Sequence, residues 1–136
     1  MAGYSGTPLQ KKLGIKPGFQ IRVLNPPVAY WEWISPLPKD VKVRKTAADP
    51  EIDFIHLFVR ERKAYEKEVL ESRKMLKQDG MIWISWPKKS SGVPSDLNEN
   101  VIRDFALKNK LVDVKVCAVD EVWSGLKLVI PVKLRK

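Results

Sequence analysis

Two short stretches of the sequence combine side chains that could bind a ligand. The first, "WPKKSSG" at 86–92, follows an apolar run and supplies ammonium groups and hydroxyls: Lys88, Lys89, Ser90 and Ser91. The second, "DEVWSG" at 120–125, supplies two carboxylates, an indole and a hydroxyl: Asp120, Glu121, Trp123 and Ser124. Cationic and hydroxyl donors of this kind suit an anion.

Three interpretations of these stretches stay open, and one of them is a contact with a macromolecule. In the first, the lysines and serines bind a small anionic ligand, Trp86 and Trp123 stack on a base, and the acidic pair binds the lysines or a metal ion. In the second, the lysines are solvated, Asp120 tethers Lys88, and both tryptophans cover the core.

Apolar runs predict the strands that position these loops. The runs at 52–59 and 81–86 are almost uninterrupted, which is typical of strands buried on both faces of a parallel sheet. Further strands are predicted at 19–24, 41–47, 111–119 and 125–133, the last two forming a hairpin.

Helices are predicted between these strands. The segment 60–80 carries Tyr65, Val69, Ser72 and Leu76 on one stripe and ends at Gly80. Ser95 or Asp96 is expected to cap the next helix. One short helix is expected at 8–13 and another within 28–38. Alternating strands and helices indicate an α/β, Rossmann-like sandwich of three layers.

Two segments resemble the class I S-adenosylmethionine-dependent methyltransferases. "LGIKPGFQIRVL" is similar to the approach to their first strand, and "LKQDGMIWISW" to the turn before their fifth. The resemblance implies a truncated version of that fold without its third strand. About six strands in the order 2-1-3-4-6-5 are expected, mainly parallel, with the last antiparallel. Ligands of open α/β sheets bind at the carboxyl ends of the strands, so both loops should meet at that edge.

A second resemblance is to the bacterial family called domain of unknown function 3052. Three segments carry it, between Tyr4 and about Val129: "YSGTPLQKKLGIKPG", "WPKKSSGV-x-SDL" and "VCAVDEVWSGLKLV". It implies a Rossmann-like fold and brings no activity with it.

The residues expected at a methyltransferase cofactor site differ from that pattern. Asn25-Pro26-Pro27 follows the first strand, where glycines would let the backbone approach the ligand. Arg44-Lys45-Thr46 ends the second strand, where an acidic residue would bind ribose hydroxyls. We therefore expect weak or no binding of S-adenosylmethionine, no other cofactor and no methyl transfer, and leave open whether the protein is an enzyme.

The single histidine and single cysteine do not suggest a catalytic or metal site. His56 lies in the middle of a predicted strand and is interpreted as a hydrogen-bonded core residue. Cys117 is interpreted as a buried, inert thiol. One histidine and one cysteine cannot form the usual zinc site, so no metal is predicted.

The composition fits one soluble domain with acidic partners. The 136 residues are expected to form one domain, 1–136, on which an N-terminal helix and turn, 1–18, pack. The net charge is +9 and is spread along the chain. No apolar run reaches the roughly 18 residues of a membrane span, and the first residues do not resemble a signal peptide, which favours the cytoplasm.

Taken together, the sequence is interpreted as a non-catalytic module that binds a small anionic ligand or has a regulatory role. Two alternatives stay open: an enzyme acting on a phosphorylated or nucleotide-like substrate, and a basic nucleic-acid-binding protein. The oligomeric state is not predicted.

Overall fold

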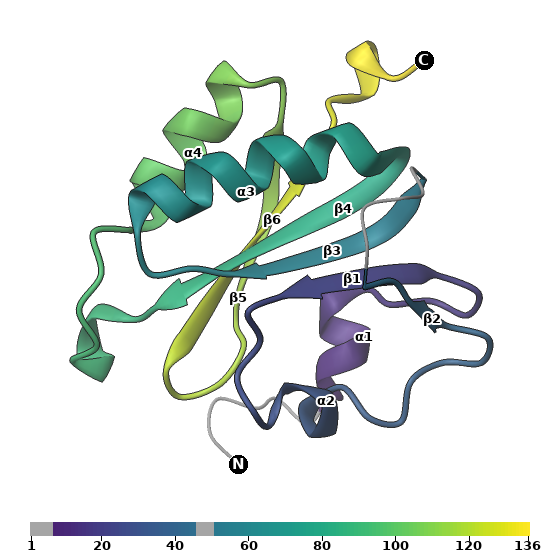
Figure 1. The fold of residues 1–136 in the computed structure, drawn as a ribbon, viewed down its shortest axis with the longest axis horizontal. Coiled ribbons are helices and arrows are strands. Elements are labelled where there is room, and N and C mark those ends of the chain that lie inside the picture. The colour runs from purple at the N-terminus through teal and green to yellow at the C-terminus, as the bar shows by residue number, and fades with distance from the viewer. Residues whose placement is uncertain (1–6, 46–50) are drawn as a thin grey trace.

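A six-stranded sheet forms the middle layer of the molecule (Figure 1). The structure is a computed structural model that describes residues 7–45 and 51–136. The strands are β1 (Gln20–Leu24), β2 (Lys42–Val43), β3 (Ile52–Phe58), β4 (Leu76–Pro87), β5 (Val112–Ala118) and β6 (Trp123–Val129).

The strand order is β2-β1-β3-β4-β6-β5, as predicted. The pairs β1–β2, β1–β3 and β3–β4 are parallel, whereas β6 runs antiparallel to both of its neighbours, β4 and β5. Hence β5 runs in the same direction as β4, and the carboxyl ends of both strands lie at one edge of the sheet.

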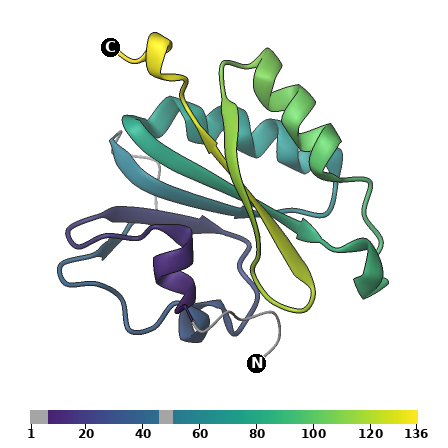
Figure 2. The same cartoon turned by 180° about the vertical axis from the view of Figure 1, so that it is seen from behind.

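Helices cover both faces of the sheet (Figures 1 and 2). One face carries α3 (Arg62–Met75) and α4 (Glu99–Lys108), and the other carries α1 (Leu9–Leu13) and α2 (Tyr30–Trp33). Two short 3-10 turns, η1 (Lys89–Ser91) and η2 (Val132–Leu134), follow β4 and β6. The α/β, Rossmann-like three-layer class is therefore confirmed.

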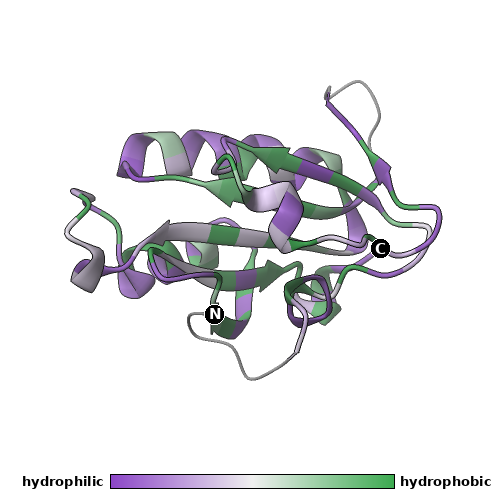
Figure 3. Ribbon diagram, turned by 90° about the horizontal axis from the view of Figure 1, so that it is seen from below, coloured by the Kyte–Doolittle hydropathy of each residue, from purple (hydrophilic) through white to green (hydrophobic). Residues whose placement is uncertain are grey.

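The core consists of two apolar clusters, one on each face of the sheet. Ile55 and Leu57 of β3 point into the cluster beneath α3 and α4, whereas Phe54 and Phe58 point into the cluster beside α1 and α2. All four side chains are buried, which explains why the run shows no polar alternation. Figure 3 shows hydrophobic stretches along the central strands and hydrophilic ones along the helices.

The end of α3 differs from the prediction. The helix stops at Met75 rather than at Gly80, because Leu76 already pairs with Ile52 as the first residue of β4. The register then shifts, so that the next pair is Phe54 with Met81. Gly80 lies in this irregular stretch, where an added Cβ would stand 3.0 Å from the carbonyl oxygen of Ile52.

Two other boundaries also differ. The cap of α4 is Asn98, whose Oδ1 accepts from the backbone N–H of Val101 at 2.9 Å, and not Ser95 or Asp96. Asp96 Oδ1 instead accepts from the backbone N–H of Arg62 at 2.7 Å, next to the start of α3. The second strand is only Lys42–Val43, and the expected end of that strand, Thr46 and Ala47, lies outside the described residues.

The first helix packs on the sheet through apolar contacts and one hydrogen bond. Leu9 and Leu13 are buried, and the Trp83 indole N–H donates to the carbonyl of Leu13 at 2.8 Å. That residues 1–136 form one domain stays a prediction. Among the described residues, no helix has the length and apolar character needed to cross a membrane.

Replacing Gly80 with alanine should destabilise the fold. The new Cβ would meet Leu76 Cδ1 at 2.8 Å and the backbone oxygen of Ile52 at 3.0 Å. Overpacking of this kind costs about 1–3 kcal/mol. Denaturant unfolding should show that loss for Gly80→Ala, whereas exposed Asp79→Ala should change stability by less than about 0.5 kcal/mol. Equal stability of the two variants would show that the close packing at Gly80 is not needed.

Candidate functional site

The two ligand-binding candidate loops meet at the carboxyl edge of the sheet. Pro87 at the end of β4 pairs with Trp123 at the start of β6. The backbone N–H of Lys88 donates to the carbonyl of Val122 at 2.7 Å, and its ammonium donates to the carbonyl of Asp120 at 2.7 Å. The predicted approach of the loops is confirmed, while their role in binding stays a prediction.

The Asp120 carboxylate accepts hydrogen bonds from the backbone of its own turn. Its Oδ1 accepts from the backbone N–H groups of Val122 at 2.9 Å and Trp123 at 2.7 Å. Lys88 therefore reaches the main chain of this turn and makes no ion pair with the carboxylate. The alternative in which Lys88 is a structural tether fits these contacts.

The remaining candidates lie in different surroundings. Ser91 Oγ donates to the carbonyl of Lys88 at 2.6 Å and accepts from the N–H of Val93, which closes the turn of η1. Ser124 lies within β6, opposite Trp86. Ser90 and Glu121 are exposed. The candidate residues of the two loops therefore do not converge on one binding site.

The first cavity lies at the end of β1 and β3. Its volume is about 370 Å³, and it is lined by residues after both strands, by α3 and by β6: Asn25, Phe58, Val59, Arg60, Glu61, Ala64, Glu68 and Trp123. The chain passes from β1 to β2 on one side and then crosses to β3 on the other. This is the topological switch point, where open α/β sheets bind ligands. We call it the switch-point cavity.

Asn25 and Glu68 form the polar wall of the switch-point cavity. Asn25 adopts a left-handed φ of 56°, which asparagine tolerates, and its amide nitrogen donates to Glu68 Oε1 at 3.0 Å. Glu68 Oε2 is buried and has no hydrogen-bond partner within the described residues. Burial raises the pKa of this carboxyl, which the Asn25 bond only partly opposes. A ligand donor placed there would satisfy a carboxylate oxygen that now lacks a partner.

The sequence analysis did not identify Asn25 or Glu68 as binding residues. Glu68 lies three residues after Tyr65 and four before Ser72, at the margin of the buried stripe of α3. An acidic residue at that margin is the signal that could have identified it. A glycine was expected at the position of Asn25 in a cofactor loop. Asparagine, however, also adopts a positive φ readily.

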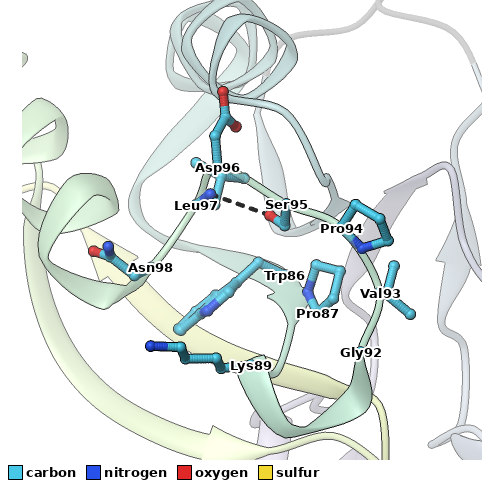
Figure 4. Close-up of a pocket in the computed structure, with 10 residues that line it drawn as sticks. All are labelled: Trp86, Pro87, Lys89, Gly92, Val93, Pro94, Ser95, Asp96, Leu97 and Asn98. Atoms are coloured by element: carbon cyan, nitrogen blue, oxygen red, sulfur yellow. Dashed lines mark hydrogen bonds between the residues drawn. The ribbon is translucent and has the colours of Figure 1, made fainter.

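A second cavity, of about 450 Å³, lies between the end of β4 and the start of α4. Apolar and polar residues line it: Trp86, Pro87, Lys89, Gly92, Val93, Pro94, Ser95, Asp96, Leu97 and Asn98 (Figure 4). We call it the Trp86 cavity. The predicted candidates Trp86 and Lys89 both line it, whereas Trp123 lines the switch-point cavity.

A buried hydrogen-bond network lies behind the switch-point cavity. His56 is fully buried in β3, with Nδ1 2.9 Å from the Tyr30 hydroxyl of α2 and Nε2 2.7 Å from Ser85 Oγ of β4. The His56 ring stacks on Phe58, which meets Trp123 edge to face, and both of these aromatic residues line the cavity. The interpretation of His56 as a hydrogen-bonded core residue is confirmed.

The thiol of Cys117 is only partly buried, in contrast to the prediction. It lies on the edge strand β5 and packs at the margin of the apolar cluster beside α1 and α2. Burial nevertheless raises its pKa, an effect that nearby Lys12 and Lys115 partly oppose. In the described part of the chain, no three His, Cys, Asp or Glu side chains gather into a possible metal site.

No family model matches the chain, and no curated protein matches it. Solved structures do. A SAM-dependent methyltransferase from Aquifex aeolicus superposes with a TM-score of 0.64 at 14% identity, over 88% of this chain and 86% of that one. Aeropyrum pernix fibrillarin with natively bound S-adenosyl-L-methionine gives a TM-score of 0.59 at 14% identity, over 94% and 71%.

A ribosomal protein L11 methylase from Lactobacillus delbrueckii subsp. bulgaricus is similar as well, with a TM-score of 0.58 at 12% identity over 90% and 74%. The chain has the class I methyltransferase fold. The fold resemblance seen in the sequence is thus confirmed. The resemblance to domain of unknown function 3052 gains no support from these comparisons.

These comparisons contradict the interpretation of the chain as a non-catalytic ligand-binding or regulatory module. The solved structures named above are a SAM-dependent methyltransferase, a ribosomal protein L11 methylase and a fibrillarin with bound S-adenosyl-L-methionine, so the fold is methyltransferase-like. The two alternatives, an enzyme for phosphorylated substrates and a nucleic-acid-binding protein, are not supported better. A methyltransferase fold is thus present although the loop after β1 has no glycine and no acidic residue follows β2 at Arg44.

Stability should fall with acid because of His56. Burial lowers the pKa of this imidazole from 6.5 to about 3, so the unfolded chain binds a proton at a pH where the folded chain does not. Stability due to this group is complete above pH 6.5 and is lost as the pH falls toward 3. His56→Gln should remove a slope of up to about 1.4 kcal/mol per pH unit.

Denaturant unfolding between about pH 7 and pH 5, above the range in which ordinary carboxyl groups titrate, measures this slope. His56 is the only histidine, so no other imidazole contributes. An unchanged slope in His56→Gln would show that the folded protein does take up a proton at this ring.

Lys88 and Lys89 should differ in their effect on stability, although the charge change is the same. Lys88→Ala removes the bond to the Asp120 carbonyl that joins the two loops. A hydrogen bond from a charged group contributes about 1.5–3 kcal/mol. Thermal unfolding should show a lower Tm for Lys88→Ala and an unchanged Tm for exposed Lys89→Ala. Equal Tm values would mean that the tether adds nothing to stability.

Proposed function

We propose that this protein binds S-adenosylmethionine in the switch-point cavity and acts as a methyltransferase. The observation that carries the proposal is Glu68 Oε2, a buried carboxylate oxygen without a partner at the place where this class of sheet binds ligands. The similarity of the fold to solved methyltransferases supports it.

The residues of the switch-point cavity fit the cofactor in three respects. The free Glu68 oxygen would accept hydrogen bonds from ribose hydroxyls or attract a cationic group of the ligand. The left-handed Asn25 turns the chain sharply after β1 without a glycine. Phe58 and Trp123 offer aromatic surface for the adenine ring. When bound, S-adenosylmethionine would supply the methyl group.

Two sequence features, the prolines after β1 and Arg44 after β2, mean that other residues would have to bind this cofactor. Pro26 and Pro27 provide no backbone N–H groups, and Arg44 at the end of β2 donates through Nε to Gln20 Oε1 at 2.6 Å. In our proposal the ribose acceptor therefore comes from α3 and not from the second strand. Membership of domain of unknown function 3052 stays a second, independent proposal, based on three sequence motifs.

The decisive measurement is calorimetry with S-adenosylmethionine. We expect measurable binding by the wild-type chain and affinity reduced by about tenfold or more in Glu68→Gln, since a hydrogen bond to a charged group is lost. Because burial raises the pKa of Glu68, the affinity should rise with pH through that raised pKa, as the carboxylate forms. Glu68→Gln should abolish this pH dependence.

Glu66→Gln is the matched control. Glu66 lies on the same helix but pairs with Arg62 on its exposed side, so this variant should bind like the wild type. Failure of the wild-type chain to bind at millimolar concentration would refute the proposal and agree with the sequence-based expectation of weak binding. Equal binding by Glu68→Gln and the wild type would place the cofactor elsewhere.

A further inference from the structure

We propose that the Trp86 cavity binds the methyl acceptor, and that this acceptor is a flat, apolar molecule with one anionic group held by Lys89. The acceptor role rests on the proposed function. The preference for an aryl anion does not, because it follows from the walls and charges of the cavity alone.

The apolar part of the Trp86 cavity suits a flat ring. Trp86 is 7% exposed and Leu97 is 7% exposed, and both belong to the core cluster under α3 and α4, so neither can easily move away. Pro87, Val93 and Pro94 add further apolar surface. A rigid indole wall beside prolines favours an aromatic or other planar body over a flexible polar one.

The polar part of the cavity favours an anion. Lys89 is the only cationic side chain among the lining residues, and neither its ammonium nor the Asn98 amide nitrogen has a partner within the described residues. Neighbouring Lys88 is held by the Asp120 carbonyl. Asn98 also begins the ten-residue helix α4, whose positive dipole end adds to the attraction for negative charge.

Asp96 is the one acidic residue of the lining, and its carboxylate does not neutralise the charge of the Lys89 ammonium. Asp96 Oδ1 accepts from the backbone N–H of Arg62 at 2.7 Å. Figure 4 shows the Asp96 carboxylate pointing away from Lys89, while the Lys89 side chain extends beside the Trp86 indole. The Trp86 indole and the Lys89 ammonium therefore face the same space, whereas the Asp96 carboxylate accepts a hydrogen bond at the start of α3.

The two cavities share a wall. Ser95 Oγ donates to the carbonyl of Arg60 at 2.7 Å, and the backbone N–H of Asp96 lies 3.3 Å from the same carbonyl. Ser95 and Asp96 line the Trp86 cavity, and Arg60 lines the switch-point cavity. Transfer of a methyl group needs donor and acceptor close together, and these contacts bring the linings of the two cavities next to each other.

The test is an NMR titration of the full chain with phenyl phosphate, benzoate and uncharged phenol. We expect both anions, and phenol at least about tenfold more weakly, to shift the Trp86 indole N–H signal, assigned by Trp86→Phe. The tighter of the two anions identifies phosphate or carboxylate as the preferred group. Lys89→Ala should weaken anion binding about tenfold and leave phenol unaffected.

Lys108→Ala is the matched control, because it removes the same charge from the opposite, exposed end of α4. It should bind the anions within about twofold of the wild type, as expected for a screened, distant charge. Absence of any shift at Trp86, equal binding of phenol and the anions, or equal weakening in both lysine variants would overturn the inference.

Calorimetry with S-adenosylmethionine separates this inference from the proposed function. If the cofactor binds and the aryl anions do not, the inference fails alone. If the anions bind at Lys89 and the cofactor does not, the proposed function fails, and with it the acceptor role, while the anion selectivity of the Trp86 cavity holds.

Discussion

Burial of β3 and β4 on both faces is the constraint on which the rest of the structure depends. Water cannot reach the polar side chains of a strand that is covered on both faces. Each such side chain must therefore form a hydrogen bond within the core or lie at an end of the strand. His56 and Ser85 are the buried polar side chains of these two strands, and they bind each other across the β3–β4 pair. The polar residues that could bind a ligand therefore lie in the loops at the carboxyl edge of the sheet.

The sequence was sufficient to predict the topology because the strongest patterns were also the most constrained elements. Two almost uninterrupted apolar runs predicted the central strands, one short hairpin predicted β5 and β6, and a resemblance supplied the strand order. Helix ends were predicted poorly where two signals competed. Gly80 resembles a helix stop, but pairing of Leu76 with Ile52 extends the strand through it, and the missing side chain serves close packing against β3 instead.

The candidate site was only partly predictable for a related reason. A sequence shows that Lys88 and Lys89 are adjacent, but not that one is bound to a facing carbonyl while the other borders a cavity. Glu68 was overlooked because a helical glutamate normally faces water. Only the contact of Asn25, just after β1, with Glu68 of α3 shows that this carboxyl group is partly buried.

The charges at the carboxyl edge are separated in a way that suits two ligands. The switch-point cavity presents an unsatisfied carboxylate oxygen, and the Trp86 cavity presents a free ammonium group. A ligand with hydroxyl donors or positive charge is favoured in the first and disfavoured beside Lys89, whereas an anion has the opposite preference. In the proposed reaction Glu68 would favour the cationic methyl donor in one cavity, and Lys89 would favour the anionic group of the acceptor in the neighbouring one.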